Sequence, residues 1–63
     1  MYNGVISMID RNTLIMQHEE ELHDAEKYKM MANDCPEWRS VLNDIAHDEE
    51  QHAHMIEHII EHM

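Results

Sequence analysis

Apolar residues recur through the second half of the chain in alternating steps of four and three residues. This spacing places side chains on one face of an α-helix, where they pack against a partner. Glu49 and His52 interrupt this face, three residues apart, at positions where apolar side chains are expected. The whole series is Trp38, Leu42, Ile45, Glu49, His52, Ile56, Ile59 and Met63.

The first half of the chain shows the same spacing with a similar interruption. Glu21 lies on the apolar face, with His18 about one turn before it and Tyr28 about two turns after it. Each half of the chain is therefore predicted to turn a glutamate toward its packing partner. The series is Leu14, His18, Glu21, Ala25, Tyr28, Ala32 and Cys35.

One break separates these two patterns, at residues 33–36, where Pro36 disfavours a helical Cys35 and suits the first position of a new helix. Ser7 and Asp10 have the spacing of an N-terminal helix cap. Weak helix formers at positions 12 and 13 indicate a start or a bend near there. The sequence thus predicts one all-α domain over residues 1–63. It is an antiparallel hairpin with a helix at about 7–33, a turn at 33–36 and a helix at about 36–62.

A chain of 63 residues cannot bury a large core, and a two-helix hairpin leaves an apolar face open. Cys35 is the only cysteine, so a disulfide within the chain is excluded. Two hairpins packed face to face form a four-helix bundle that covers both open faces. We therefore expect a homo-oligomer, with a two-fold dimer as its smallest unit.

The net charge of −10, with only four Lys and Arg residues, argues against nucleic-acid and anionic-membrane partners. An acidic surface attracts cations, including Fe²⁺. The sequence contains no run of about 18 apolar residues that would span a bilayer. The first residues lack the basic start of a signal peptide, so a cytoplasmic location is expected.

A carboxylate on a packed helix face needs a cationic partner or a metal. In a dimer, two copies each of Glu21, Glu49 and His52 supply four carboxylates and two imidazoles. That ligand set is typical of a di-iron or di-manganese centre in a four-helix bundle. Alternatively, Glu49 and His52 form a hydrogen-bonded pair within one helix at a hydrated interface.

These residues resemble a known family. Glu21 with Tyr28 seven residues later, and the run Asp48-Glu49-Glu50-Gln51-His52, are similar to the helix motifs of ferritin-like proteins of the rubrerythrin type. The segment Leu42-Asn43-Asp44-Ile45-Ala46 resembles the family's approach to the second motif. The resemblance covers about residues 14–60 and is greatest to short two-helix members such as the encapsulated ferritins.

The resemblance implies oxidation of Fe²⁺ by oxygen or peroxide at two irons per dimer, with manganese or zinc as other possible metals. Tyr28 would hydrogen-bond a ligand glutamate or donate an electron, and His18 would support the site or add a ligand. The spacing from Glu21 to Glu49 is slightly short for the family, which makes Glu20 a rival ligand. The electron donor is unidentified, since the chain contains no rubredoxin-like domain. A metal-stapled oligomerisation module without enzymatic activity is the alternative function.

The last third of the chain is rich in histidine and glutamate. Histidines four residues apart on a helix can chelate transition metals. The sequence leaves three interpretations open: an iron entry or storage patch, a metal site at a contact between molecules, or a solvated polar face. The histidines are His47, His54, His58 and His62, flanked by Glu50, Glu57 and Glu61.

Overall fold

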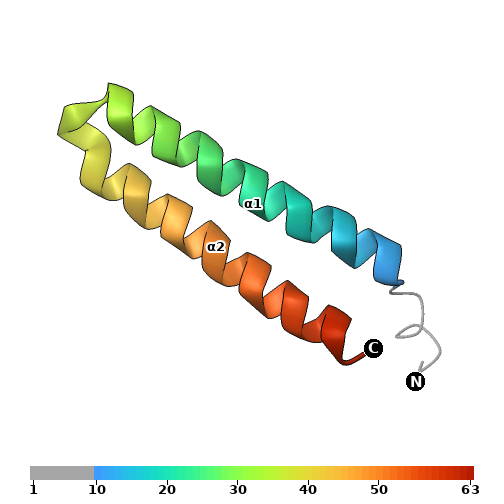
Figure 1. Ribbon diagram of the computed structural model, residues 1–63. Helices are drawn as coiled ribbons and strands as arrows, with labels where there is room; N and C mark the ends of the chain where they lie inside the picture. The colour runs from blue at the N-terminus through green and yellow to red at the C-terminus, as the bar shows by residue number, and fades with distance from the viewer. Residues whose placement is uncertain (1–9) are drawn as a thin grey trace, which may run out of the picture.

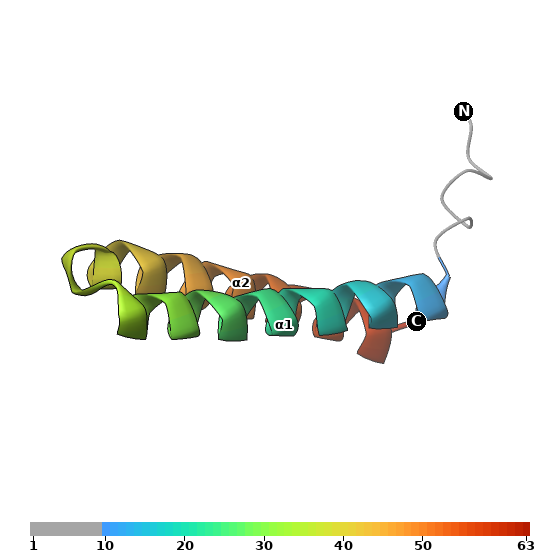
Figure 2. The same cartoon turned by 90° about the horizontal axis from the view of Figure 1, so that it is seen from above.

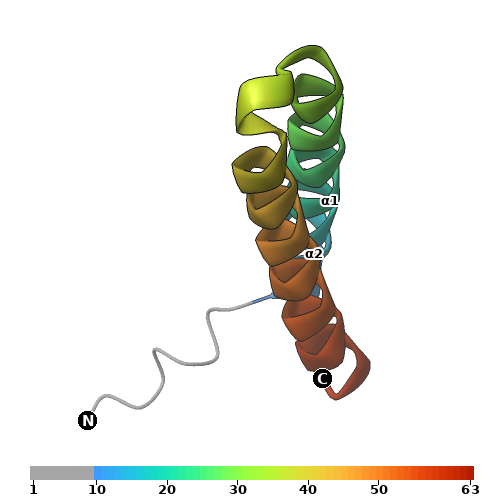
Figure 3. The same cartoon turned by 90° about the vertical axis from the view of Figure 1, so that its left-hand side faces the viewer.

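The computed structural model describes residues 10–63, and over that range the protein is a pair of antiparallel α-helices (Figure 1). Helix α1 spans Arg11–Asp34, a short 3₁₀ helix η2 spans Pro36–Trp38, and helix α2 spans Arg39–Glu61. The two long helices lie side by side over their lengths and form a single layer (Figures 2 and 3). Residues 10–63 contain no β-strand, which confirms the prediction of two helices in an all-α chain.

Helix α1 begins where a side chain accepts a hydrogen bond from one of its first free N–H groups. Asp10 has an extended backbone, and its Oδ1 atom accepts a hydrogen bond of 2.8 Å from the Thr13 N–H. This bond lowers the pKa of the Asp10 carboxyl. The helix therefore begins at Arg11, whereas the expected range of about 7–33 placed Asp10 inside it. Ser7, the other residue of the predicted cap, lies outside the described residues.

The turn between the helices follows from one proline and one arginine. Cys35 has φ −128° and ψ 81°, a non-helical conformation as predicted for a residue before proline. Arg39 then reaches back to the end of α1, where its Nε atom donates to the Ala32 carbonyl at 3.1 Å and its Nη2 atom to the Asn33 carbonyl at 3.4 Å. These carbonyls have no partner within the helix. The α-helical conformation of α2 begins at Arg39, after η2, rather than at Pro36.

The contact between the helices is built on alanine. Ala25 and Ala32 on α1, and Ala46 and Ala53 on α2, are the only fully buried residues of the described chain, each at most 2% exposed. Small side chains at seven-residue intervals let two helices approach closely, and larger side chains then flank the contact. All seven positions of the apolar face predicted for the first helix are buried or half-buried, which confirms that prediction.

The face of α2 that contacts α1 differs from the predicted one. Ala46 and Ala53 occupy its centre, one residue after the predicted Ile45 and His52. The side chain of His52 is 56% exposed. The prediction was based on the large apolar residues, whereas the two helices come closest at the small alanines. The predicted face and the observed face of α2 have the half-buried positions 42, 49 and 56 in common. Trp38, Ile59 and Met63 of the predicted face are exposed.

A lysine–glutamate ion pair joins the two helices. The Lys29 ammonium on α1 donates to Oε2 of Glu50 on α2. Glu50 raises the pKa of Lys29, and Lys29 lowers the pKa of Glu50, because the hydrogen bond between them, together with their opposite charges, favours the ionised form of each. The pair links α1 to α2 at the surface, since both side chains are more than a third exposed. Neither helix of residues 10–63 has an apolar stretch of the length a bilayer crossing requires.

Candidate metal centre

Three predicted ligands from both helices come together midway along the hairpin. Glu21 lies on α1, and Glu49 and His52 lie on α2. One ligand atom from each residue falls in a group whose members are all within 4.8 Å of one another. The Nδ1 atom of His52 lies 3.3 Å from Oε1 of Glu49 and 3.8 Å from Oε1 of Glu21. Among residues 10–63 this is the only such group of three or more acidic, histidine or cysteine side chains.

The spacing of these atoms fits a single transition-metal ion. Nitrogen and oxygen ligands lie about 2.0–2.2 Å from such an ion, so two ligands of one ion lie roughly 3–4 Å apart. Both distances from His52 Nδ1 fall in that range. The group can therefore receive a metal with small adjustments of its side chains.

The two carboxylates are the most shielded charges of the group. The side chains of Glu21 and Glu49 are only 15% and 20% exposed, against 56% for His52. Within residues 10–63, no Lys or Arg nitrogen lies within 4 Å of either glutamate. Lys27 pairs with Asp24, Lys29 pairs with Glu26 and Glu50, and Arg39 binds backbone carbonyls. Partial removal of a carboxylate from water carries a free-energy cost unless a cationic group or a metal lies beside it, so this pair favours a bound cation.

Gln17 orients one of the carboxylates, and sequence analysis missed this contact. The Nε2 atom of Gln17 donates a hydrogen bond of 3.2 Å to Oε2 of Glu21, one turn later on α1. The other oxygen, Oε1, is the one nearest His52. The signal in the sequence was the four-residue spacing, which brings Gln and an acidic residue together on a helix.

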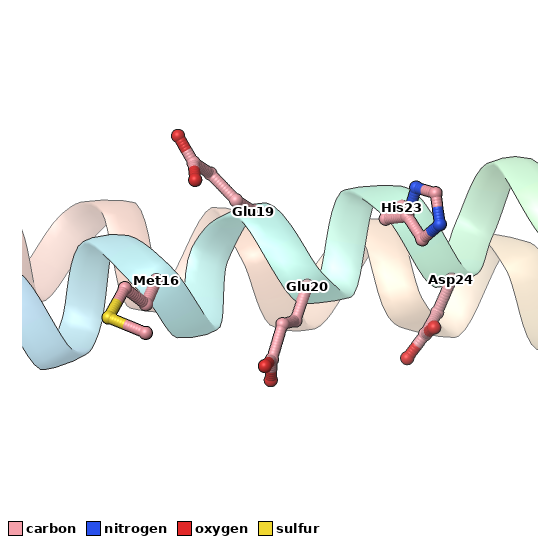
Figure 4. Close-up of a pocket in the computed structure, with 5 residues that line it drawn as sticks. All are labelled: Met16, Glu19, Glu20, His23 and Asp24. Carbon is pink, nitrogen blue, oxygen red and sulfur yellow. The ribbon is translucent and has the colours of Figure 1, made fainter.

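Glu20, the rival ligand, lies outside the group. It is exposed on the surface of α1 beside Met16, Glu19, His23 and Asp24. Figure 4 shows Glu20 and Asp24 projecting to one side of α1, while Glu19 and His23 project to the other. Of the two candidate glutamates on α1, only Glu21 is placed beside Glu49 and His52.

The two other predicted site residues are half-buried and lie outside the group. Tyr28 has Lys27 Nζ at 5.4 Å from its ring centroid, and within residues 10–63 its hydroxyl makes no hydrogen bond to Glu21 or Glu49. The hydrogen bond expected from Tyr28 to a ligand glutamate is thus not formed in a single chain. His18 lines a different groove, with Leu22, His47, Glu50, Gln51, Ala53, His54 and Glu57.

An apolar surface adjoins the group. Glu21 and His52 line a shallow groove together with Met55, Ile56 and Ile59. Met55 is 65% exposed and Ile59 is 48% exposed. The exposed edge of His52 therefore opens onto a surface that can be covered by another apolar helix face.

Comparisons with known proteins identify no relative of this chain: no family model matches it, and no curated protein or solved structure is detectably similar. The likeness to ferritin-like proteins rests on the motif residues alone.

Proposed function

We propose that this protein is a ferritin-like di-iron protein that oxidises Fe²⁺ at a site shared between two chains. The observation that carries the proposal is that two shielded carboxylates, Glu21 and Glu49, lie beside the imidazole of His52. Within residues 10–63, neither carboxylate has a Lys or Arg partner. An isolated hairpin leaves their charge uncompensated, and a divalent cation compensates it.

The donor set supports iron or manganese. Two carboxylates and one imidazole combine hard oxygen with borderline nitrogen ligands, a combination that suits Fe²⁺ and Mn²⁺. Mg²⁺ and Ca²⁺ prefer oxygen ligands alone, and structural zinc sites commonly use thiolates. The lone thiol, Cys35, lies at the turn and is not one of the three grouped residues.

A second copy of the chain completes the proposed site. One chain supplies three side chains, whereas two chains related by a two-fold axis supply four carboxylates and two imidazoles, enough for two ions. The four carboxylate charges balance the four charges of two divalent metals. Exposed apolar residues of α2 support the assembly into a four-helix bundle, because they lie on or beside the groove at His52; they include Met55 and Ile59.

In the proposed reaction Fe²⁺ is the substrate. Each Fe²⁺ gives up one electron; oxygen takes two electrons and two protons to become hydrogen peroxide, or hydrogen peroxide takes two of each to become two waters. Glu21 and Glu49 hold the cations and stabilise the higher charge of Fe³⁺. His52 binds through Nδ1, and Gln17 keeps the Glu21 carboxylate turned toward the site.

The test is the rate of iron oxidation in air after anaerobic loading, followed by the near-ultraviolet absorbance of Fe³⁺. Glu49→Ala should abolish rapid oxidation, whereas Glu57→Ala, an exposed glutamate of the same helix, should leave it unchanged. Circular dichroism confirms that both variants remain helical. Oxidation at the native rate in Glu49→Ala would overturn the proposal.

A metal-binding module without enzymatic activity is the second candidate, and one observation favours it. The four fully buried residues of the hairpin are all alanines, so the described chain has little core of its own. A metal that joins α1 to α2 would then serve as a structural staple. Oxygen reactivity separates the two functions: a staple binds iron tightly but does not turn over Fe²⁺ in air.

A further inference from the structure

Two histidines meet at the C-terminal end of α2, in a place separate from the proposed iron site. His58 lies in the last turn of the helix, and His62 is its C-cap residue, four positions later. Their ring centroids are 4.3 Å apart and the ring planes are inclined by 43°. Imidazoles on successive turns of a helix can reach a single ion.

A hydrogen bond fixes the protonation of one of these rings. The Nδ1 atom of His62 lies 2.8 Å from the backbone carbonyl oxygen of His58. Because a carbonyl only accepts, Nδ1 must carry the proton, and in the neutral ring the lone pair then lies on Nε2. Histidines that bind metals are commonly held in this way, with the second ring nitrogen donating to a carbonyl or carboxylate. The Nε2 atom of His62 is therefore free to bind a metal.

The electrostatics of this end of the helix also favour a cation. The C-terminus of an α-helix carries partial negative charge on its free carbonyl groups. Glu61 adds a carboxylate in the last turn, and the chain as a whole has a net charge of −10.

From these observations we infer that His58 and His62 form a second metal site, which binds a divalent late transition metal such as Cu²⁺, Ni²⁺ or Zn²⁺. These ions prefer imidazole ligands, while Fe²⁺ and Mn²⁺ bind such nitrogen sites more weakly. The site belongs to a single chain and needs no dimer. It is therefore independent of Glu21, Glu49 and His52, and the two proposals can fail separately.

His54 is the alternative partner for His58, since it lies four residues before it. The His54 Nδ1 atom lies 3.5 Å from Oε1 of Glu57, and this contact leaves its Nε2 atom free, as in His62. The structure favours His62 because its ring contacts that of His58, the only close pair of aromatic or histidine rings in the described chain.

The experiment uses Cu²⁺ as the probe, in the full chain carrying Glu49→Ala so that the proposed iron site is disabled. Titration should show one site per chain, with nitrogen hyperfine structure from imidazole in the electron paramagnetic resonance spectrum. His58→Ala and His62→Ala should each weaken binding by about tenfold or more, because each removes half of a chelate. His23→Ala is the matched control, as an exposed histidine of α1, and should leave the affinity unchanged.

Two results would overturn this assignment. If the variants at positions 58 and 62 bind Cu²⁺ as tightly as their parent, these histidines are not the ligands. If His54→Ala weakens binding and His62→Ala does not, the site is formed by the other pair. Zn²⁺ added to a ¹⁵N-labelled sample provides a second measurement, and it should shift the Nε2 resonance of His62.

Discussion

The Nδ1 atom of His52 on α2 lies 3.8 Å from Oε1 of Glu21 on α1, so the candidate metal centre spans the two helices. Its geometry depends on the register of the hairpin. Two contacts mark that register: the buried alanines between the helices and the ion pair of Lys29 with Glu50. A shift of one helix by a single residue would turn Glu21 away from His52.

A first prediction concerns the cost of the unpaired carboxylate. Replacing Glu49 with Leu should stabilise the metal-free protein by about 1 kcal/mol, because it removes a shielded charge that has no Lys or Arg partner. Thermal unfolding with a chelator present measures this. Added Fe²⁺ or Mn²⁺ should then raise the Tm of the native protein and not of the variant. A loss of stability in the metal-free variant would mean that Glu49 and His52 stabilise the fold as a simple helical pair.

A second prediction concerns the proposed dimer. Ile59→Glu places a charge in the groove beside His52 and should convert the dimer to a monomer, since each interface would bury two such charges. Met30→Glu, at a residue of α1 that is 65% exposed and outside that groove, should leave the dimer intact. Sedimentation equilibrium distinguishes the two species. A dimer that survives Ile59→Glu would place the interface elsewhere.

A third prediction concerns pH and the link between the helices. Lys29 lowers the pKa of Glu50 from its ordinary value of 4.5, so the contribution of this pair is present above that value and disappears as the pH falls through the lowered pKa. Glu50 raises the pKa of Lys29 above 10.5, so the same contribution disappears as the pH rises through the raised pKa. Lys29→Met should lower the Tm at neutral pH. Its Tm should approach that of the native protein at low pH and at high pH, where one partner of the ion pair is uncharged.

The control for this prediction is Lys27→Met. Lys27 pairs at 4.0 Å with Asp24 on its own helix, so it does not join α1 to α2. Its removal should change the Tm less than removal of Lys29 at neutral pH. Equal Tm values for the native protein and Lys29→Met across the whole pH range would show that the inter-helix pair contributes nothing to stability.

Sequence pattern was enough to predict the two helices and the break at Pro36, because proline and the helical spacing act locally. It was also enough to predict that Glu21, Glu49 and His52 lie together, since glutamates within apolar series are conspicuous, although His52 lies at the exposed edge of the helix contact. The face of α2 could not be predicted to one residue, because Ala46 and Ala53 are weak hydrophobic signals yet allow the closest helix contact.

The contacts of Gln17 and Arg39 were missed for a different reason. Both are hydrogen bonds of long polar side chains, and their partners depend on side-chain conformations and on the path of the turn. A spacing of four residues made the contact of Gln17 with Glu21 possible, but many such pairs form no bond. The Arg39 contact with Ala32 required knowledge of how the chain reverses direction.

Native mass spectrometry of the anaerobically iron-loaded protein counts chains and metal ions in one experiment. If Glu21, Glu49 and His52 of two chains hold two metal ions, the spectrum should show a species of twice the 7.6 kDa chain mass that carries two irons. Glu49→Ala should lack both irons. A native chain that remains monomeric at saturating Fe²⁺, or a dimer that carries no iron, would show that these residues do not form a shared two-metal site.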